Sequence, residues 1–252
     1  MSTESVPLAR PGDIAEALAL LTRLPMPAQT EHRGAQAAWA WPLAGVAVAL
    51  LAGLAGWGAL TLGLPVALAA GLILATQVAA TGALHEDGLA DSADGLWGGQ
   101  TRARRLEIMK DSRIGSYGVL ALILSIGLRW SALAAILDAG ALFAPLIAVA
   151  VLSRAPMAVL MAALPNARGD GLAQSVGRPA QDSATLGVLV ALALAFAILG
   201  WGTLAPILWA AFAVIALAAI ARAKIGGQTG DILGATQQVA EIAALAALAA
   251  TL

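Results

Sequence analysis

Seven long apolar runs constrain this chain more than any other feature of its sequence. An α-helix needs roughly 20 mostly apolar residues to cross about 30 Å of hydrocarbon. We therefore predict an all-α, polytopic integral membrane protein with about seven transmembrane helices. The predicted spans cover residues 42–64, 65–84, 116–137, 141–164, 185–200, 203–221 and 233–252.

The composition excludes several other classes of protein. Hydrophobic residues make up 60% of the chain and charged residues only 12%, against about 45–50% and about 25% in soluble domains. A water-soluble enzyme or a disordered chain is therefore excluded. The absence of cysteine excludes disulfides and thiolate chemistry, and two histidines are too few for a multi-histidine metal site. With a net charge of -1, we expect no nucleic-acid partner.

Ahead of the first span, residues 13–24 alternate polar and apolar side chains at helical spacing. Asp13 is a candidate N-cap, and Pro25 and Pro27 follow the pattern and end it. We predict an N-terminal amphipathic helix at the membrane surface.

The basic residues predict the orientation. Segments 1–41, 85–115, 165–184 and 222–232 lie on one side of a seven-span topology and hold 12 of the 14 Lys and Arg residues. Such loops face the cytoplasm. The other two, Arg129 and Arg154, lie inside predicted spans. For Arg129, beside Trp130, we expect only an interfacial role. Arg154 lies deeper and is either functional or engaged in snorkelling or a salt bridge.

Segment 85–115, which we take as the main active-site segment of a single catalytic domain (1–252), holds three regularly spaced carboxylates. Asp87, Asp91 and Asp94 are spaced i, i+4, i+7, so a helix continuing from the second span places them on one face. Stacked like charges destabilise a helix, and oxygen ligands suit Mg²⁺ or Mn²⁺. The alternative is a solvated loop whose acids pair with neighbouring arginines.

Basic residues follow these acids. Arg102, Arg104 and Arg105 either grip phosphate or anchor lipid headgroups. Lys110 and Arg113 flank Asp111 beside a Gly-x-x-Gly turn, which favours a role in the site.

Two further loops bring polar groups to the same side. Residues 164–173 contribute Asn166, Arg168 and Asp170, and residues 223–235 form a glycine-rich loop around Thr229 and Asp231. That loop either binds phosphate or a nucleotide, or is a turn whose Asp caps the last helix. Four one-sided segments rich in acids, bases and glycines indicate phosphoryl transfer at the cytoplasmic surface.

At these residues the chain resembles the cobalamin synthase family, the adenosylcobinamide-GDP ribazoletransferases. Residues 85–95, HEDGLADSADG, fit its pattern H-x-D-G-L-A-D-x-x-D-G. Weaker matches follow in order along the chain. They are residues 21–25, 41–45, 109–118, 153–154, 165–171 and 227–235, with Glu241.

The resemblance implies a reaction in which a ribose hydroxyl of α-ribazole, or of its 5′-phosphate, attacks the cobinamide-linked phosphorus of adenosylcobinamide-GDP. Adenosylcobalamin or its 5′-phosphate forms and GMP leaves, with Mg²⁺ as cofactor. The expected setting is a bacterial inner membrane with the site facing the cytoplasm. The expected partners, beside the lipid bilayer, are further copies of the same chain and other enzymes of the corrinoid pathway.

The resemblance also implies roles for individual residues. His85 is a general base or an orienting group, and Asp94 is a competing base. The implied metal ligands are Asp87, Asp91, Asp94 and Asp231. The implied phosphate or substrate contacts are Glu86, Lys110, Asp111, Arg113, Arg154, Arg168, Thr229 and Gly230.

Two other functions remain open from the residues. A CDP-alcohol phosphotransferase also carries D-x-x-D-G, as in Asp91 to Gly95, but its following Ala-Arg and later G-x-x-x-D-x-x-x-D are missing. An ion-coupled transporter needs ionisable groups near mid-membrane, whereas the charges here cluster in one-sided loops.

Overall fold

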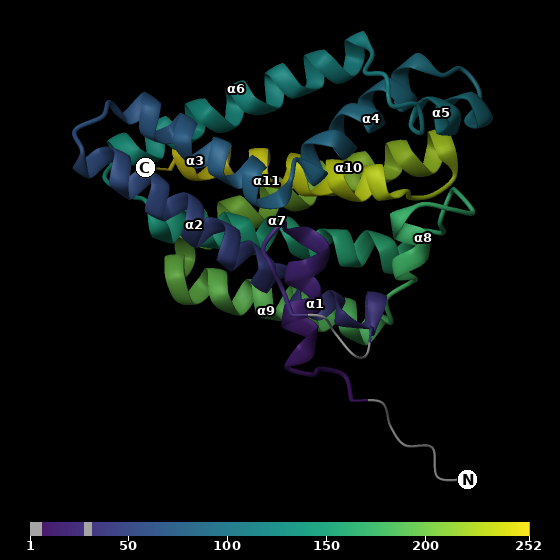
Figure 1. Cartoon of the computed structure of the whole chain (residues 1–252), viewed down its shortest axis with the longest axis horizontal. Coiled ribbons are helices and arrows are strands. Elements are labelled where there is room, and N and C mark those ends of the chain that lie inside the picture. Colours follow the sequence, from purple (N-terminus) through teal and green to yellow (C-terminus); the bar gives the residue numbers. More distant parts are fainter. Residues whose placement is uncertain (1–6, 28–31, 252) are drawn as a thin grey trace.

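The computed structural model describes residues 7–27 and 32–251. Within these ranges the chain is built of helices and contains no β-strand, only an isolated bridge between Asn166 and Gln228. Most of the long helices run side by side along the long axis of the molecule (Figure 1). The predicted all-α class is confirmed.

The helices differ in length according to the runs from which they form. In chain order they are α1 (Gly12–Leu21), η1 (Gly34–Ala40), α2 (Trp41–Thr61), α3 (Val66–Thr81), α4 (Leu84–Gly98), α5 (Arg102–Ile108), α6 (Ser116–Asp138), α7 (Phe143–Ala163), α8 (Leu172–Val176), α9 (Gln181–Leu199), η2 (Gly200–Thr203), α10 (Leu204–Ile225) and α11 (Gly230–Ala249).

Five helical stretches of the described chain are long and apolar enough to cross a membrane, or six if the bent pair α3 and α4 forms one span. One stretch, Gln181–Ile225, contains both α9 and α10. These two helices line the same cavity through Val188 and Leu192 on one and Ile207 and Val214 on the other. By length and hydropathy the described chain therefore has five or six candidate spans rather than the predicted seven, although a helix lies at each of the seven predicted runs. Leu252, the end of the last predicted span, lies outside the described residues.

The second span does not continue straight into the acidic helix, contrary to the expectation. Gly82 and Ala83 both adopt the left-handed conformation, with φ of 65° and 58°, and α4 turns away from α3 by 88°. Glycine takes this conformation without strain, whereas alanine rarely does. A side chain at position 82 would also meet Arg23, whose Nε would lie 2.2 Å from its Cβ. The break lets α4 leave the line of α3 and pack along α6 and α11.

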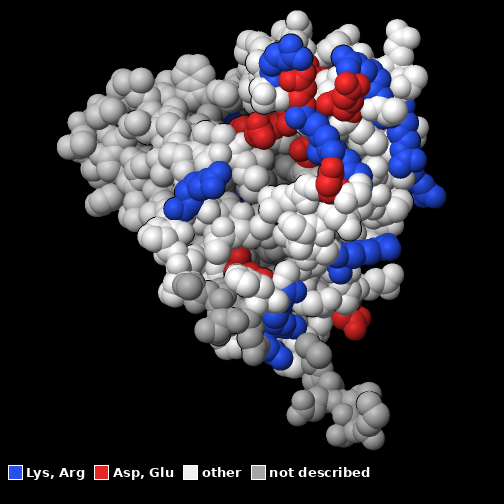
Figure 2. Space-filling model, turned by 45° about the vertical axis from the view of Figure 1, so that its right-hand side comes forward, with Lys and Arg blue, Asp and Glu red and all other residues white. Residues whose placement is uncertain are grey.

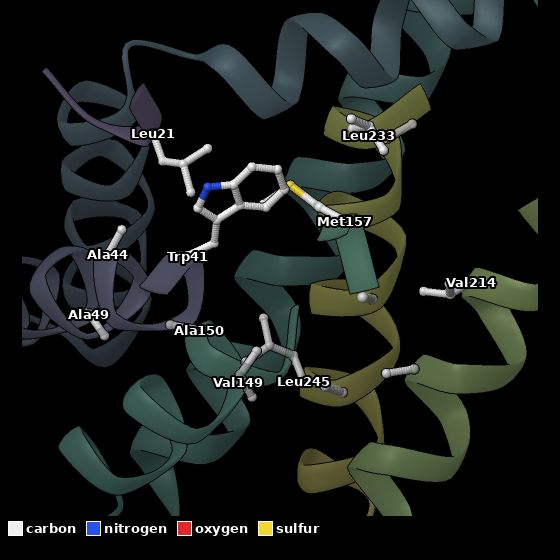
Figure 3. Packing of buried hydrophobic residues seen from close by; sticks show 14 of the residues in the cluster. Leu21, Trp41, Ala44, Ala49, Val149, Ala150, Met157, Val214, Leu233 and Leu245 are labelled. Atoms are coloured by element: carbon white, nitrogen blue, oxygen red, sulfur yellow. The ribbon is translucent and has the colours of Figure 1, made fainter. Parts of the chain in front are cut away.

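Small residues hold the centre of the bundle together. Ala44, Ala49 and Ala52 of α2 are fully buried, and a Cβ on Gly45 would lie 2.5 Å from the carbonyl oxygen of Ala150 on α7. In lipid, helices associate by close van der Waals packing, which small residues permit. Figure 3 shows this packing around Trp41.

The N-terminal helix is confirmed, but Asp13 is not its N-cap. The cap position is Pro11, and the Asp13 carboxylate, 1% exposed, accepts hydrogen bonds from Arg33 and the Trp39 indole at 2.6 Å each. A buried carboxylate needs partners, and the loop after α1 brings them. α1 is thereby fastened to η1.

Candidate functional site

Charged side chains gather at one end of the molecule, which we call the polar end. Figure 2 shows the acidic and basic groups crowded together there, around a hollowed surface. The start of α11, the end of α10 and the short helices α5 and α8 all lie at this end (Figure 1). The structure thus brings together the loops that carry the predicted site residues.

Three carboxylates from two helices form what we call the carboxylate face: Asp87 and Asp91 on α4 and Asp231 at the start of α11. The helices meet through glycines, because a Cβ on Gly88 would lie 2.8 Å from the carbonyl oxygen of Asp231, and one on Gly234 would lie 3.2 Å from the Cα of Gly88. The Asp91 carboxylate is repelled by Asp87 and Asp231. Only the absence of side chains at positions 88 and 234 allows this approach.

One arginine partly offsets the negative charge of the carboxylate face. Arg168 binds Asp231 at 2.5 Å and also attracts Asp91. Its loop is held against the loop before α11 by hydrogen bonds between Ala167 and Gln228 (2.8 Å) and between Gln228 and Pro165 (2.9 Å). The predicted pair of loops is therefore one unit.

Thr229 caps the last helix. Its hydroxyl accepts a hydrogen bond from the Ile232 amide at 3.3 Å and donates one to Asp231 at 3.2 Å. If the glycine-rich loop is an ordinary turn, the sequence predicts Asp231 as the cap of the last helix. In the structure the cap is Thr229. Gly230 follows as the first residue of α11.

Asp94 lies on α4 as predicted, but its carboxylate has a structural task. It accepts hydrogen bonds from the amides of Gly115 (2.7 Å) and Gly118 (2.9 Å) at the start of α6. An anion at a helix N-terminus is stabilised by the unpaired amides and the helix dipole. Asp94 therefore docks α6 onto α4.

The loop between α5 and α6 carries exposed ion pairs. Lys110 binds Asp170, and Arg113 binds Asp111 at 2.8 Å. The side-chain hydrogen bonds from Arg113 lower the pKa of Asp111 to about 2. Such exposed pairs contribute little to stability.

The α5 arginines also bond to the protein. Arg104 pairs with Glu107 at 2.8 Å, Arg105 donates to the Lys224 carbonyl at 3.2 Å, and Arg102 donates to the Ala167 carbonyl at 3.5 Å. These contacts join α5 to the loop that carries Ala167, through Arg102, and to the end of α10, through Arg105.

The expectation for Arg129 was wrong. This residue is 1% exposed, and its guanidinium binds Glu86 at 2.8 Å and Glu241 at 3.1 Å. A charge buried this deeply requires paired and hydrogen-bonded partners. Proximity to Trp130 had suggested an interface, but the helix turns the two side chains to different surroundings, and Trp130 bonds the Ala67 carbonyl instead.

Amide side chains complete this buried cluster. Gln238 accepts a hydrogen bond from Arg129 at 2.9 Å and Gln77 accepts one at 3.3 Å. We call Arg129, Glu86, Glu241, Gln77 and Gln238 the internal ion network. The role of the glutamines was not predicted from the sequence, although two adjacent Gln residues inside an apolar run could have indicated a buried polar cluster.

Glu86 was expected to contact substrate phosphate, and the structure places it differently. Its carboxylate lies 6% exposed in the internal ion network, while the next residue along α4, Asp87, is exposed at the polar end. Adjacent positions on a helix point about 100° apart. α4 thus joins the internal ion network to the carboxylate face.

Arg154 on α7 and His85 on α4 are both buried. Arg154 donates to the Ala150 carbonyl at 3.1 Å, and within the described residues its Nε and the Nε2 of His85 have no hydrogen-bond partner. His85 lines a cavity beneath α8, together with Trp41 and Ala173.

The donor set at the carboxylate face fits a hard cation shared with a substrate. Across residues 7–27 and 32–251, no group of three or more His, Asp or Glu side chains is placed to hold a metal by itself. Mg²⁺ typically takes only one or two carboxylates and completes its shell with water and substrate phosphates. Asp87 and Asp91 offer such oxygens.

Comparisons with known proteins agree with these observations. Residues 13–249 match the family model described as cobalamin-5-phosphate synthase. The adenosylcobinamide-GDP ribazoletransferase of Bradyrhizobium diazoefficiens is 50% identical over 217 residues, covering 86% of this chain and 84% of the relative. The enzyme of the same name from Sinorhizobium medicae is 47% identical, covering 94% and 95%. No solved structure matches.

Proposed function

The chain belongs to the cobalamin-5-phosphate synthase family, and on that premise we propose that it acts as an adenosylcobinamide-GDP ribazoletransferase. A ribose hydroxyl of α-ribazole, or of its 5′-phosphate, attacks the cobinamide-linked phosphorus. The bond from that phosphorus to the GMP oxygen breaks, and the hydroxyl proton passes to a base. Adenosylcobalamin or its 5′-phosphate and GMP leave.

The carboxylate face is the observation that carries this proposal. It gathers three acids and the partnering Arg168 at the polar end, beside exposed basic side chains. Phosphoryl transfer needs little covalent chemistry from the protein and depends on positioning and charge neutralisation. A metal cation and arginines around a diphosphate supply both the positioning and the charge neutralisation. Neither the phosphotransferase nor the transporter alternative has support from the family match.

We assign Asp87 and Asp91 as the residues that would hold Mg²⁺, with Asp231 held by Arg168. The ion, when bound, neutralises charge on the transferring phosphoryl group and its leaving oxygens. Arg168 and Lys110 are placed to exchange their present carboxylate partners for diphosphate oxygens. Each oxygen of the Asp94 carboxylate accepts one amide hydrogen bond at the start of α6, so we assign Asp94 to positioning α6 rather than to the metal.

His85 is the base that fits this arrangement better than Asp94. Its Nε2 has no hydrogen-bond partner among the described residues, and His85 lies two residues before Asp87 on α4. A general base must reach the hydroxyl whose proton it accepts. We therefore assign proton acceptance to the Nε2 of His85.

We further propose that the polar end faces the cytoplasm in a bacterial inner membrane. The predicted one-sided segments with 12 of the 14 Lys and Arg residues support this orientation. α6 and α10 present exposed apolar side chains such as Leu124, Leu208 and Phe212 to the surrounding lipid.

A turnover assay on the purified chain in liposomes tests the proposal. Adenosylcobinamide-GDP, α-ribazole and Mg²⁺ are mixed, and GMP and adenosylcobalamin are followed together, with and without EDTA. We expect equal amounts of both products, and loss of both when EDTA is present. Folded protein that forms neither product, with α-ribazole or with its 5′-phosphate, contradicts the proposed function. Unchanged turnover in EDTA contradicts the metal assignment alone.

A further inference from the structure

A small cavity lies beneath α8, next to the carboxylate face, and we call it the α8 chamber. It has a volume of about 60 Å³. Ala173 and Val176 of α8 cover it. Its other walls include Trp41, His85, Met157, Met161 and Leu233.

Two buried nitrogens in the walls of the α8 chamber lack partners. Trp41 is 3% exposed and His85 2% exposed. Neither the indole Nε1 of Trp41 nor the Nε2 of His85 bonds any described residue. Leaving a buried polar atom unpaired is costly, so native proteins satisfy nearly all such atoms. An otherwise apolar chamber with one ring donor and one imidazole nitrogen indicates a flat ligand with a few polar atoms.

Trp41 also connects this chamber with a larger one. Leu20, Trp41 and Val176 line both the α8 chamber and a neighbouring cavity of about 310 Å³. Small-molecule sites typically occupy about 300–1,000 Å³, so the α8 chamber alone is too small, while the two together reach this range. Figure 3 shows the Trp41 indole between Leu21 and Met157, with its nitrogen on the side of Leu21.

The α8 chamber opens toward the residues proposed for chemistry. His85 belongs to the same turn of α4 as Asp87, and Gly230 and Gly234, which line the chamber, flank Asp231 on α11. A ligand held between Trp41 and His85 therefore has one end at the carboxylate face. An acceptor substrate needs this placement, because its hydroxyl must reach the phosphorus while its remainder is held away from it.

Building on the proposed function, we propose that the α8 chamber and its 310 Å³ neighbour bind the aromatic base of the acceptor, α-ribazole. The base is a substituted benzimidazole whose unglycosylated ring nitrogen accepts the free indole N–H of Trp41. Met157 and Met161 contact its apolar surface, as methionine sulfur does favourably with aromatic rings. The ribose then lies toward His85, whose Nε2 meets the attacking hydroxyl.

Filling the chamber tests this assignment. Ala173→Leu places a larger side chain beneath α8 without changing any charged group. With both substrates varied independently, we expect the KM for α-ribazole to rise at least tenfold. The KM for adenosylcobinamide-GDP and kcat should stay within about twofold. Benzimidazole should inhibit the unmodified protein competitively against α-ribazole, and its inhibition constant should rise in the variant.

Trp41→Phe keeps the aromatic wall and removes only the N–H donor. Loss of one hydrogen bond corresponds to about a threefold to tenfold rise in the KM for α-ribazole. Trp57→Phe, on the same helix but exposed, and Ala216→Leu, exposed on α10, are the matched controls and should leave both KM values unchanged.

The outcomes separate this inference from the proposed function. If the unmodified protein turns over but Ala173→Leu and Trp41→Phe leave the KM for α-ribazole unchanged, only water fills the α8 chamber and the inference fails. Equal rises in both KM values also overturn it, since they indicate a general disturbance. If the unmodified protein makes no product, the proposed function itself fails.

Discussion

The internal ion network and the carboxylate face both take their carboxylates from α4 and α11, but they balance these charges differently. In the network, one guanidinium binds two carboxylates, and two amide side chains accept its remaining hydrogen bonds. On the face, three carboxylates share one arginine. In a dry interior every charge must be paired, whereas excess charge persists only where water or a ligand can reach it. The unbalanced cluster is thus the one suited to a cation and a phosphate.

Removing the central cation of the network should have the largest effect on stability. Arg129→Gln leaves Glu86 and Glu241 buried without a cation, and breaking a buried pair in this way costs about 3–5 kcal/mol. We expect a large fall in the melting temperature of the detergent-purified protein, measured by thermal scanning.

The matched control is Arg222→Gln, an exposed arginine near the polar end of α10, which should melt as the unmodified protein does. If Arg129→Gln melts at the same temperature as this control, the network does not stabilise the bundle.

Asp94→Asn should have an intermediate effect, because Asp94 bonds protein amides although it belongs to the acidic helix. An amide side chain has only one acceptor oxygen, so one of the Gly115 and Gly118 amides loses its partner. We expect a destabilisation of about 1–3 kcal/mol, with reduced turnover because α6 is no longer held in place. Reduced turnover with no change in melting temperature would instead favour a direct catalytic or metal role for Asp94.

Asp91→Asn should have the smallest effect on stability and a large effect on activity. Removing one of three mutually repelling carboxylates leaves the melting temperature equal or slightly higher, while turnover with Mg²⁺ falls at least a hundredfold. Asp138→Asn, exposed at the far end of α6, serves as the control for both measurements. If the Asp91→Asn variant retains near-normal turnover, Asp91 is not a ligand of the metal.

Most of the helices were predictable because hydropathy and spacing are local properties. The run at 116–137 became α6 (Ser116–Asp138) and the run at 141–164 became α7 (Phe143–Ala163), since a backbone in lipid must satisfy its own hydrogen bonds within a helix. The break at Gly82 and Ala83 was not predictable. A left-handed alanine is strained by itself, and only the surrounding packing keeps it there.

The sequence alone determined that this is a polytopic all-α membrane protein with its ionisable loops gathered toward one side, and its motifs determined the family. These conclusions follow from residue type and order, which set the free energy of transfer into lipid and which side chains share a helix face. Only the tertiary structure decided that Glu86 turns inward to Arg129 while Asp87 stays exposed. Likewise, only the fold assigned Asp94 to the start of α6 and left Trp41 and His85 with unpaired nitrogens beneath α8. The physical reason is that hydrogen bonds and ion pairs act over a few ångströms. Glu86 and Glu241 meet Arg129 only after helices distant in sequence have packed together.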